Sequence, residues 1–358
     1  MTSAPPSSGQ GPPPGAGRGR VPSPETVRRR RAVALAALAL VIVLIVSIAA
    51  SGGGSHGKAK KRSASSASES APARFNVRAS ALKLPTALQF PAAAALEGQQ
   101  FVLLGGLESG ESSTSAVTVF EAGRAIAHAS LPEPQHDAPA VRLGGMVYVF
   151  GGGQEASYDH ILRFDPGTSS VTQAGTLPQA SSDSAAAVVG ETAYVIGGYN
   201  GQQALDTIVA WRPGGGAEVV AHLPSGLRYA AAAASGSSIV IAGGTPGEAA
   251  SSAILRFDPS TRQVLPIGQL PAATEHASAF ALGRYVYLVG GRGSAPGSET
   301  SAIVAIDPST GRTASAGTLP QALSDAGVVA AQGGAWVAGG AAAGGPVDSI
   351  LQLERVGP

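Results

Sequence analysis

The sequence predicts an all-β fold, a β-propeller of six four-stranded blades, because two short markers recur in phase along most of the chain. Six Leu-Pro pairs recur in phase at intervals of 46 to 49 residues, and a Gly-Gly pair follows each one. Repeats of this length are typical of propeller blades. The first marker begins at Leu84, Leu131, Leu177, Leu223, Leu270 and Leu319. The second comprises Gly105-Gly106, Gly151-Gly152, Gly197-Gly198, Gly243-Gly244, Gly290-Gly291 and Gly339-Gly340.

Each repeat contains strand-like segments in the same order, as the third repeat illustrates. A small apolar run at 185–189 precedes a β-branched and aromatic run at 192–198 that ends in the two glycines. Further strand-like runs follow at 207–211 and 217–221, separated by a Pro/Gly turn. Alanine-rich first runs such as 230–234 have high helix propensity, but the repeat phase overrides it. Small side chains also suit the crowded inner strand of a blade.

The last repeat is one strand short, because only three strand-like runs follow its Leu-Pro pair, the third at 349–356. Ahead of the first Leu-Pro pair, residues 74–81 alternate apolar and polar side chains from Phe75 to Ala81, which is the period of a half-buried strand. We therefore expect this N-terminal strand to complete the sixth blade, three strands plus one. Such closure would cover a sheet edge that is otherwise exposed.

Three features of the repeats resemble kelch repeats. An aromatic residue stands shortly before the glycines, as at Tyr148 and Tyr194, Asp-Pro turns recur, as at Asp165-Pro166, and Leu-Pro opens each unit. The resemblance covers residues 73–358 and implies a kelch-type propeller, although the usual fourth-strand tryptophan is missing. Arginine outnumbers lysine twenty to four, which together with abundant alanine is typical of a high-GC bacterial genome. The chain thus resembles a divergent bacterial kelch protein.

The first 72 residues predict a membrane anchor outside the propeller. Residues 32–50 carry no charge and only Ser47 is polar, and nineteen helical residues span about 28 Å, close to the hydrocarbon thickness. Arg28–Arg31 directly precede this segment, which places the N-terminus in the cytoplasm and the propeller outside it. We expect residues 1–31 to be a disordered cytoplasmic tail and residues 51–72 a flexible linker. The alternative is a cleaved signal peptide, although the length of the segment favours an anchor.

Charge and cysteine content exclude several classes of function. Residues 1–72 carry ten Lys and Arg against two Glu, whereas the rest of the chain has 14 basic and 21 acidic residues, a net charge of −7. A mildly acidic folded part disfavours nucleic acid as a partner, because phosphate binding requires a basic surface. The absence of cysteine excludes disulfides, thiolate metal sites and a cysteine nucleophile.

We expect a ligand site at the mouth of the central channel. The connections between blades share one face of a propeller with the loops that follow the glycines, and we call this side the loop face. Five and six positions after each Leu of Leu-Pro stand residues that differ from repeat to repeat, as expected for a site specialised blade by blade. The residues expected to bind ligand are Gln89, Phe90, His136, Asp137, Asp183, Arg228, Tyr229, Glu275, His276 and Asp325, with Tyr158 and Tyr199 from the loops after the glycines. Other polar residues of those loops, Arg292 among them, are expected to be solvated.

The favoured function is a non-catalytic binding or sensing module at the cell envelope that engages a protein or glycan through the loop face. The sequence contains no zinc-binding helix motif, phosphate-binding loop motif or nucleophile turn motif, so we expect no metal or cofactor and favour binding over catalysis. The alternative is a carbohydrate-active enzyme, a sugar mutarotase or epimerase, resembling bacterial kelch propellers that isomerise sialic-acid-type sugars. Glu275 and His276 would then be the catalytic acid and base, and Arg228 would bind a carboxylate. His136-Asp137 with Glu275-His276 also have donor chemistry for a metal ion, but their spacing matches no known motif.

Overall fold

The computed structural model describes residues 71–356, and every regular element in this range is a β-strand. The predicted tail 1–31, the predicted membrane helix 32–50 and all but the last two residues of the linker 51–72 lie outside the described residues. Among the residues that are described, no helix has the length and hydropathy that a membrane crossing needs.

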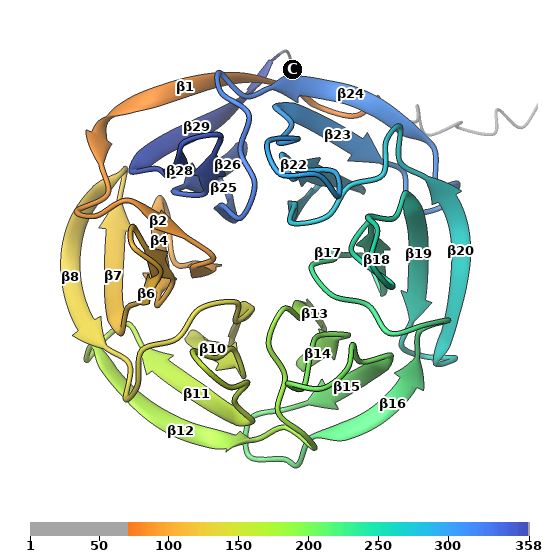
Figure 1. Ribbon diagram of the computed structural model, residues 1–358, viewed down its shortest axis with the longest axis horizontal. Coiled ribbons are helices and arrows are strands. Elements are labelled where there is room, and N and C mark those ends of the chain that lie inside the picture. Colours follow the sequence, from red (N-terminus) through yellow and green to blue (C-terminus); the bar gives the residue numbers. More distant parts are fainter. Residues whose placement is uncertain (1–70, 357–358) are drawn as a thin grey trace, which may run out of the picture. The chain divides into compact units, whose positions relative to one another are not determined.

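Six antiparallel sheets of four strands each surround a central channel within residues 71–356, and we call each sheet a blade (Figure 1). Blade 1 comprises β3 (Ala92–Ala95), β4 (Gln100–Leu104), β7 (Ala116–Glu121) and β8 (Arg124–Ser130). Blade 2 comprises β9 (Ala140–Leu143), β10 (Met146–Phe150), β11 (His160–Asp165) and β12 (Ser170–Thr176). Blade 3 comprises β13 (Ala185–Val189), β14 (Thr192–Ile196), β15 (Thr207–Trp211) and β16 (Glu218–His222).

The remaining blades repeat this order from the channel outwards. Blade 4 comprises β17 (Ala231–Ser235), β18 (Ser238–Ala242), β19 (Ala253–Asp258) and β20 (Gln263–Gln269). Blade 5 comprises β21 (Ser278–Leu282), β22 (Tyr285–Val289), β23 (Ala302–Ile306) and β24 (Thr313–Thr318). Blade 6 comprises β25 (Gly327–Ala331), β26 (Gly334–Ala338), β29 (Ser349–Val356) and, on its outer edge, β1 (Arg74–Lys83). The alanine run in β17 is therefore an inner strand, as the repeat phase predicted.

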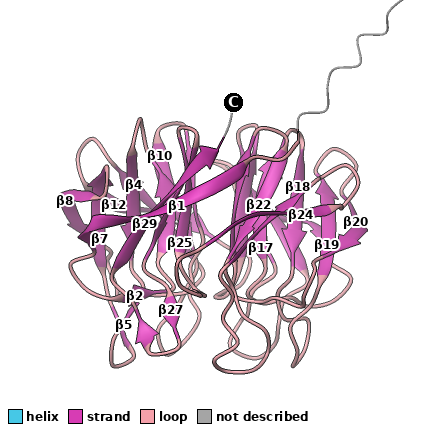
Figure 2. Ribbon diagram, turned by 90° about the horizontal axis from the view of Figure 1, so that it is seen from above, coloured by secondary structure: helices cyan, strands magenta, loops and turns pink. Residues whose placement is uncertain are grey.

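Short additional strands that the sequence did not predict lie on the loop face, where Figure 2 shows β2, β5 and β27 on one side of the ring. β2 (Leu88–Gln89) pairs with β5 (Leu107–Glu108), which pairs with β6 (Ser112–Ser113), and β27 (Ala341–Ala342) pairs with β28 (Gly345–Pro346). Isolated bridges, such as Ser182 with Tyr199, join the equivalent loops of other blades. The connection between blades and the loop after the glycines therefore do share one face.

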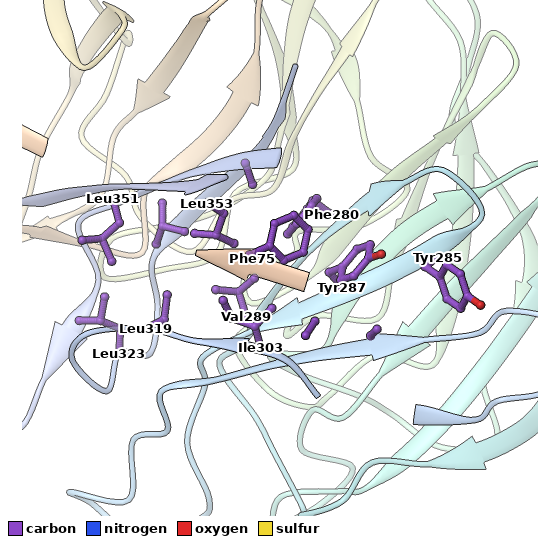
Figure 3. Packing of buried hydrophobic residues seen from close by; sticks show 14 of the residues in the cluster. Phe75, Phe280, Tyr285, Tyr287, Val289, Ile303, Leu319, Leu323, Leu351 and Leu353 are labelled. Atoms are coloured by element: carbon purple, nitrogen blue, oxygen red, sulfur yellow. The ribbon is translucent and has the colours of Figure 1, made fainter. Parts of the chain in front are cut away.

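Strand β1 closes the ring as the sequence predicted, since it pairs antiparallel with β29, from Arg74 opposite Val356 to Val77 opposite Leu353. Phe75 is buried, and its ring makes edge contacts with Phe280 and Tyr287 of blade 5 (Figure 3). The hydroxyl of Tyr287 also accepts a hydrogen bond from the backbone N–H of Ala73 at 2.8 Å. The N-terminal strand thus joins blade 6 to blade 5 through a shared apolar cluster.

The predicted alternation along this strand is wrong beyond Val77. Ala79 and Ala81 are exposed, whereas Ser80 between them is half-buried. Ala79 is still in register opposite Leu351, and the pairing with β29 becomes irregular between Ala79 and Lys83. Such a bulge changes the direction in which successive side chains point, so a strict period of two ends there.

The Gly-Gly pairs are required where neighbouring blades meet. Gly151 has φ +58°, and a Cβ at this position would clash with the backbone carbonyl oxygen of Ser181 from the next connection. The N–H of Gly152 donates to that same carbonyl at 2.9 Å. Glycine therefore supplies both the left-handed conformation and the space for a hydrogen bond that joins the blades.

Candidate functional site

Six residues at equivalent positions form a closed circle at the loop-face end of the channel, and we call this circle the mouth ring. It comprises Phe90, Asp137, Asp183, Tyr229, His276 and Asp325. Each has a left-handed backbone, with φ between +52° and +58°. The N–H of each donates to the carbonyl of its counterpart in the preceding blade at 2.9 to 3.3 Å, and the bond from Phe90 to Asp325 completes the circle. Left-handed backbone is uncommon in non-glycine residues, so the packing of the blades imposes it here.

A cavity of about 180 Å³ lies within the mouth ring and is lined by all six of its members. Its walls continue along the inner strands, where alanine predominates, with Pro91 and Pro139 beside them. The six residues that precede the mouth-ring residues, such as Arg228 and Glu275, do not line the cavity. Five of those six form single bridges to the loops after the glycines, and Gln89 pairs with Leu107 in β2. The positions that stand five and six residues after each Leu of Leu-Pro therefore form two sets. The six mouth-ring residues line the cavity, and the six residues that precede them do not.

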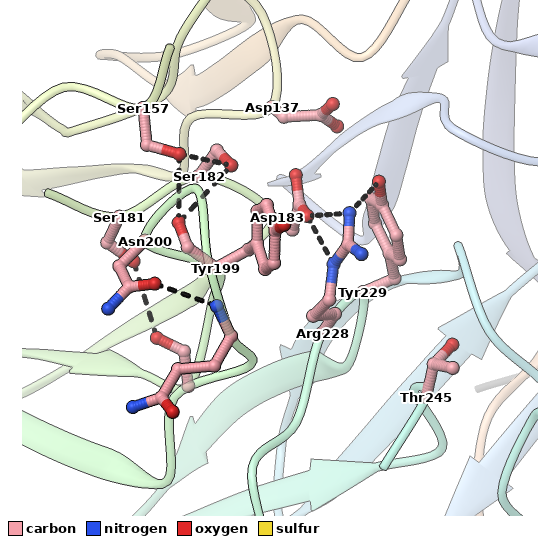
Figure 4. Close-up of polar contacts among 12 residues, drawn as sticks. Asp137, Ser157, Ser181, Ser182, Asp183, Tyr199, Asn200, Arg228, Tyr229 and Thr245 are labelled. Carbon is pink, nitrogen blue, oxygen red and sulfur yellow. Dashed lines mark hydrogen bonds and ion pairs between the residues drawn. The ribbon is translucent and has the colours of Figure 1, made fainter. Parts of the chain in front are cut away.

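Arg228, in the connection between blades 3 and 4, contacts Asp183, Tyr229 and Tyr199 at the mouth (Figure 4). Its guanidinium donates to Asp183 at 2.6 Å and to the hydroxyl of Tyr229 at 3.0 Å. The same group lies 4.2 Å from the ring centroid of Tyr199, a cation–π contact. The carboxylate of Asp183 is 4% exposed, so its charge is compensated within the protein. Tyr199, predicted as a ligand contact, is thus a support for Arg228.

His276 is held between a carboxylate and a guanidinium. Its Nδ1 lies 2.5 Å from Asp325 Oδ1, and its Nε2 lies 2.9 Å from Arg292 Nη2. A guanidinium can only donate, so Nε2 accepts and the proton of a neutral imidazole resides on Nδ1, which donates to Asp325. The imidazole also stacks on Tyr229, with ring centroids 3.7 Å apart. Both ring nitrogens are therefore occupied by partners from the protein.

Glu275 is bonded to groups on the loops that follow the glycines. One carboxylate oxygen accepts a hydrogen bond from the hydroxyl of Thr245, and the other lies 3.5 Å from Arg292 Nη2. The Glu275 side chain is 8% exposed. Arg292 was expected to be solvated, which is wrong, because it contacts both Glu275 and His276. Its position directly after the fifth Gly-Gly pair, bridged to Glu275, is the signal that would have identified it.

Asp137 differs from the other carboxylates of the mouth because it has no close partner. The nearest polar group is Nε2 of His136 at 3.6 Å, too far for a hydrogen bond. Burial, followed by repulsion from Asp183 and Asp325, raises the pKa of Asp137 well above its usual value. The imidazole of His136 contacts Ser113 through Nδ1 at 2.9 Å, and burial lowers its pKa. Asp137 and His136 thus both favour their neutral forms.

Tyr158, predicted to contact a ligand, lies away from the mouth ring. The hydroxyl of Tyr158 donates to the backbone carbonyl of Pro134 at 3.4 Å, and its ring lies 5.0 Å from that of His160. Phe90, in contrast, lies between two imidazoles, with ring centroids 6.2 Å from His136 and 5.8 Å from His276. Phe90 is therefore the aromatic side chain that faces the cavity from blade 1.

The metal-binding alternative can be examined in the part of the chain that the structure describes. Within residues 71–356, no group of three or more His, Asp or Glu side chains is arranged to hold a metal ion. The two pairs considered for this role are engaged elsewhere, His136 with Ser113 and Glu275 with Thr245.

Comparison with known proteins gives the family. No curated protein matches the chain. A solved structure titled "Structure of YjhT" is similar in fold, with a TM-score of 0.66 at 17% identity over 78% of this chain and 100% of that one. The family model described as the KLHDC2/KLHL20/DRC7 Kelch-repeats domain matches residues 91–291, more than half of the chain. The chain therefore belongs to this kelch-repeat family, which confirms the resemblance of its repeats.

Proposed function

We propose that this chain is a six-bladed kelch propeller at the cell envelope that binds a glycan in the channel mouth without converting it. In this proposal residues 32–50 anchor the chain in the membrane, the N-terminus is cytoplasmic and the propeller is extracytoplasmic. The support for the membrane part is the charge and hydropathy of the sequence. The support for the binding part is the geometry of the mouth.

The observation that carries the proposal is that the two predicted acid–base groups, Glu275 and His276, are each held by other groups of the protein. Both nitrogens of His276 and both oxygens of Glu275 have partners, so neither group has a free position for proton transfer to a ligand. Such a network keeps the surrounding side chains in fixed positions. Rigid, preorganised polar groups around a cavity favour binding.

A glycan fits the loop face better than a protein does. The core of a protein interface is built from exposed apolar and aromatic side chains. Among the described residues, the exposed large hydrophobic side chains all belong to strands of the blades: three are on outermost strands and one is at the end of β29, and none is in the loops of the loop face. They are Leu82, Ile126, Leu265 and Val356. The mouth instead offers hydrogen-bonding groups around a cavity that would admit one sugar ring.

One observation favours the alternative, a sugar mutarotase or epimerase. The carboxyl of Asp137 has a raised pKa and lines the cavity, which are the properties of a general acid. Under this alternative Asp137 would protonate a ring oxygen, and the catalytic roles predicted for Glu275 and His276 would be positioning roles.

A sugar library screened against the full-length chain in detergent tests the proposal. We expect saturable binding, seen as a rise in the thermal unfolding temperature, which Phe90→Ala weakens at least tenfold. Tyr158→Ala, on the same face but away from the mouth, is the matched control and should bind normally. NMR of the anomeric protons in the same samples measures turnover. Anomerisation that is accelerated by the wild type and lost in Asp137→Asn would establish the enzyme instead, and absence of any binding would refute both.

A further inference from the structure

The cavity within the mouth ring is acidic. The ionisable side chains that line it are Asp137, Asp183, Asp325, His276 and Tyr229, and no lysine or arginine is among the lining residues. Both ring nitrogens of His276 are bonded to protein groups, Nδ1 to Asp325 and Nε2 to Arg292. Burial raises the pKa of Tyr229, which therefore stays uncharged. Carboxyl groups are therefore the most numerous ionisable groups in the lining of this cavity.

The three carboxyl groups differ in whether the protein supplies a partner. Asp183 pairs with Arg228 at 2.6 Å. Asp325 accepts hydrogen bonds from His276 and from the hydroxyl of Ser324, both at 2.5 Å. The Asp137 side chain is 12% exposed, and its closest ionic partner, His136, is 3.6 Å away, beyond hydrogen-bond distance. A mostly buried carboxyl without a donor is unfavourable, so it is the group whose interaction a ligand can complete.

The walls around Asp137 suit an organic cation better than a bare metal ion. Metal ions such as calcium require six to eight oxygen ligands, and no suitable group is present among residues 71–356. Alanine side chains make up most of the remaining lining, together with the ring of Phe90, other apolar residues and two serines. Apolar walls, an aromatic ring and a carboxylate together are the chemistry that recognises an ammonium group on a carbon skeleton.

The cavity volume limits how much of a ligand can enter. A protein cavity of about 150 Å³ holds a molecule the size of benzene. The 180 Å³ cavity therefore accommodates about one six-membered ring. Any longer chain attached to that ring would extend from the mouth across the loop face.

We propose that the ligand carries a protonated amino group on its terminal ring, as an amino sugar does, and that the carboxylate of Asp137 binds it. This inference rests on the proposed glycan-binding function and names its ligand class. The groups that face Asp137 are Asp183, Asp325, Arg228, Tyr229 and His136.

Binding of the cation is linked to pH. The pKa of Asp137 is raised, mainly by burial, and an ammonium group beside the carboxyl favours its ionised form. Binding therefore releases a proton, and affinity falls up to tenfold per pH unit below the pKa of Asp137. Burial lowers the pKa of the neighbouring His136, which favours its neutral form.

Calorimetric titration of the full-length chain in detergent tests the inference with four probes. They are D-glucosamine, N-acetyl-D-glucosamine, D-glucose and ethylammonium. We expect glucosamine to bind at least tenfold more tightly than N-acetylglucosamine at pH 7.5, with proton release measured from two buffers of different ionisation enthalpy. Asp137→Asn should abolish this preference, whereas Asp159→Asn, an exposed carboxylate on the same face, should keep it. Thermal unfolding of both variants establishes that they are folded.

The outcomes separate this inference from the proposed function. Equal binding of the three sugars, or binding of glucosamine that Asp137→Asn leaves unchanged, overturns the amino-group inference while glycan binding stands. Binding of ethylammonium without any sugar supports the cation site and refutes glycan binding. If neither glucosamine nor ethylammonium binds at millimolar concentration, the inference is wrong.

Discussion

Burial of Phe75 provides a direct prediction about how the ring of blades is closed. Phe75 is 5% exposed and is the one fully buried side chain of β1. Phe75→Ala removes the contacts of its ring with Phe280 and Tyr287, at centroid distances of 5.7 and 5.1 Å. The neighbouring side chains are themselves closely packed, so they can fill the vacated space only in part.

The magnitude follows from this packing. Replacing a buried phenylalanine by alanine costs about 3–5 kcal/mol, of which two edge-to-face pairs account for about 1–3 kcal/mol. Arg78→Ala on the same strand is the control, because its side chain is 72% exposed and pairs only with Glu354 at 3.0 Å. An exposed ion pair contributes about 0–1 kcal/mol. The two variants should therefore differ by at least about 2 kcal/mol.

Urea unfolding of the full-length chain in detergent, followed by circular dichroism of the strands, measures the free energy of unfolding of each variant. The account predicts that Phe75→Ala shifts the midpoint to clearly lower urea, whereas Arg78→Ala stays close to wild type. Equal stability of the two variants would refute the reasoning, because β1 would then not hold blade 6 to blade 5.

Three further predictions concern the blade junctions and the mouth. Gly151→Ala should destabilise the fold more than Gly144→Ala in thermal unfolding. Both glycines have a left-handed backbone, with φ +58° at Gly151 and +56° at Gly144, but only at Gly151 would the added Cβ meet a backbone carbonyl. Equal losses of stability in the two variants would contradict this. Arg228→Ala should cost about 3 kcal/mol in urea unfolding by leaving Asp183 buried without its cation, and adding Asp183→Asn should recover part of that loss. The raised pKa of Asp137 means that the folded state holds this proton more tightly, so wild-type stability falls as pH rises from about 3.9 through the folded pKa. Asp137→Asn should lack this fall in unfolding free energies measured from pH 4 to 8, and parallel curves would show that the carboxyl is not perturbed.

Much of the fold could be predicted because the repeat supplies independent copies of one pattern. The runs 185–189, 207–211 and 349–356 coincide with β13, β15 and β29. Pairing of 74–81 with the last strand followed from counting the strands that each repeat requires. Trp211 has the same position in its repeat as Phe164 and Phe257, and its ring contacts Tyr148 and Phe150 of blade 2.

The contacts of the mouth could not be predicted in the same way. The sequence located the mouth-ring positions, but their shared left-handed backbone is imposed by hydrogen bonds between blades. Which side chains then contact each other depends on how far each one extends across the mouth. The contact of Arg292 with His276 was therefore not predicted, and Tyr199, predicted to contact ligand, contacts Arg228. The lack of a partner for Asp137 likewise depends on the connections between blades that bring Asp183 and Asp325 near it.

The central claim is that ligands bind at the mouth ring, and hydrogen–deuterium exchange with and without D-glucosamine tests it most directly. The account predicts slower exchange in the connections that carry Phe90, Asp137 and His276, with the outer strands of the blades unchanged. Protection confined to the outer strands, or to the loop of Tyr158, would contradict it.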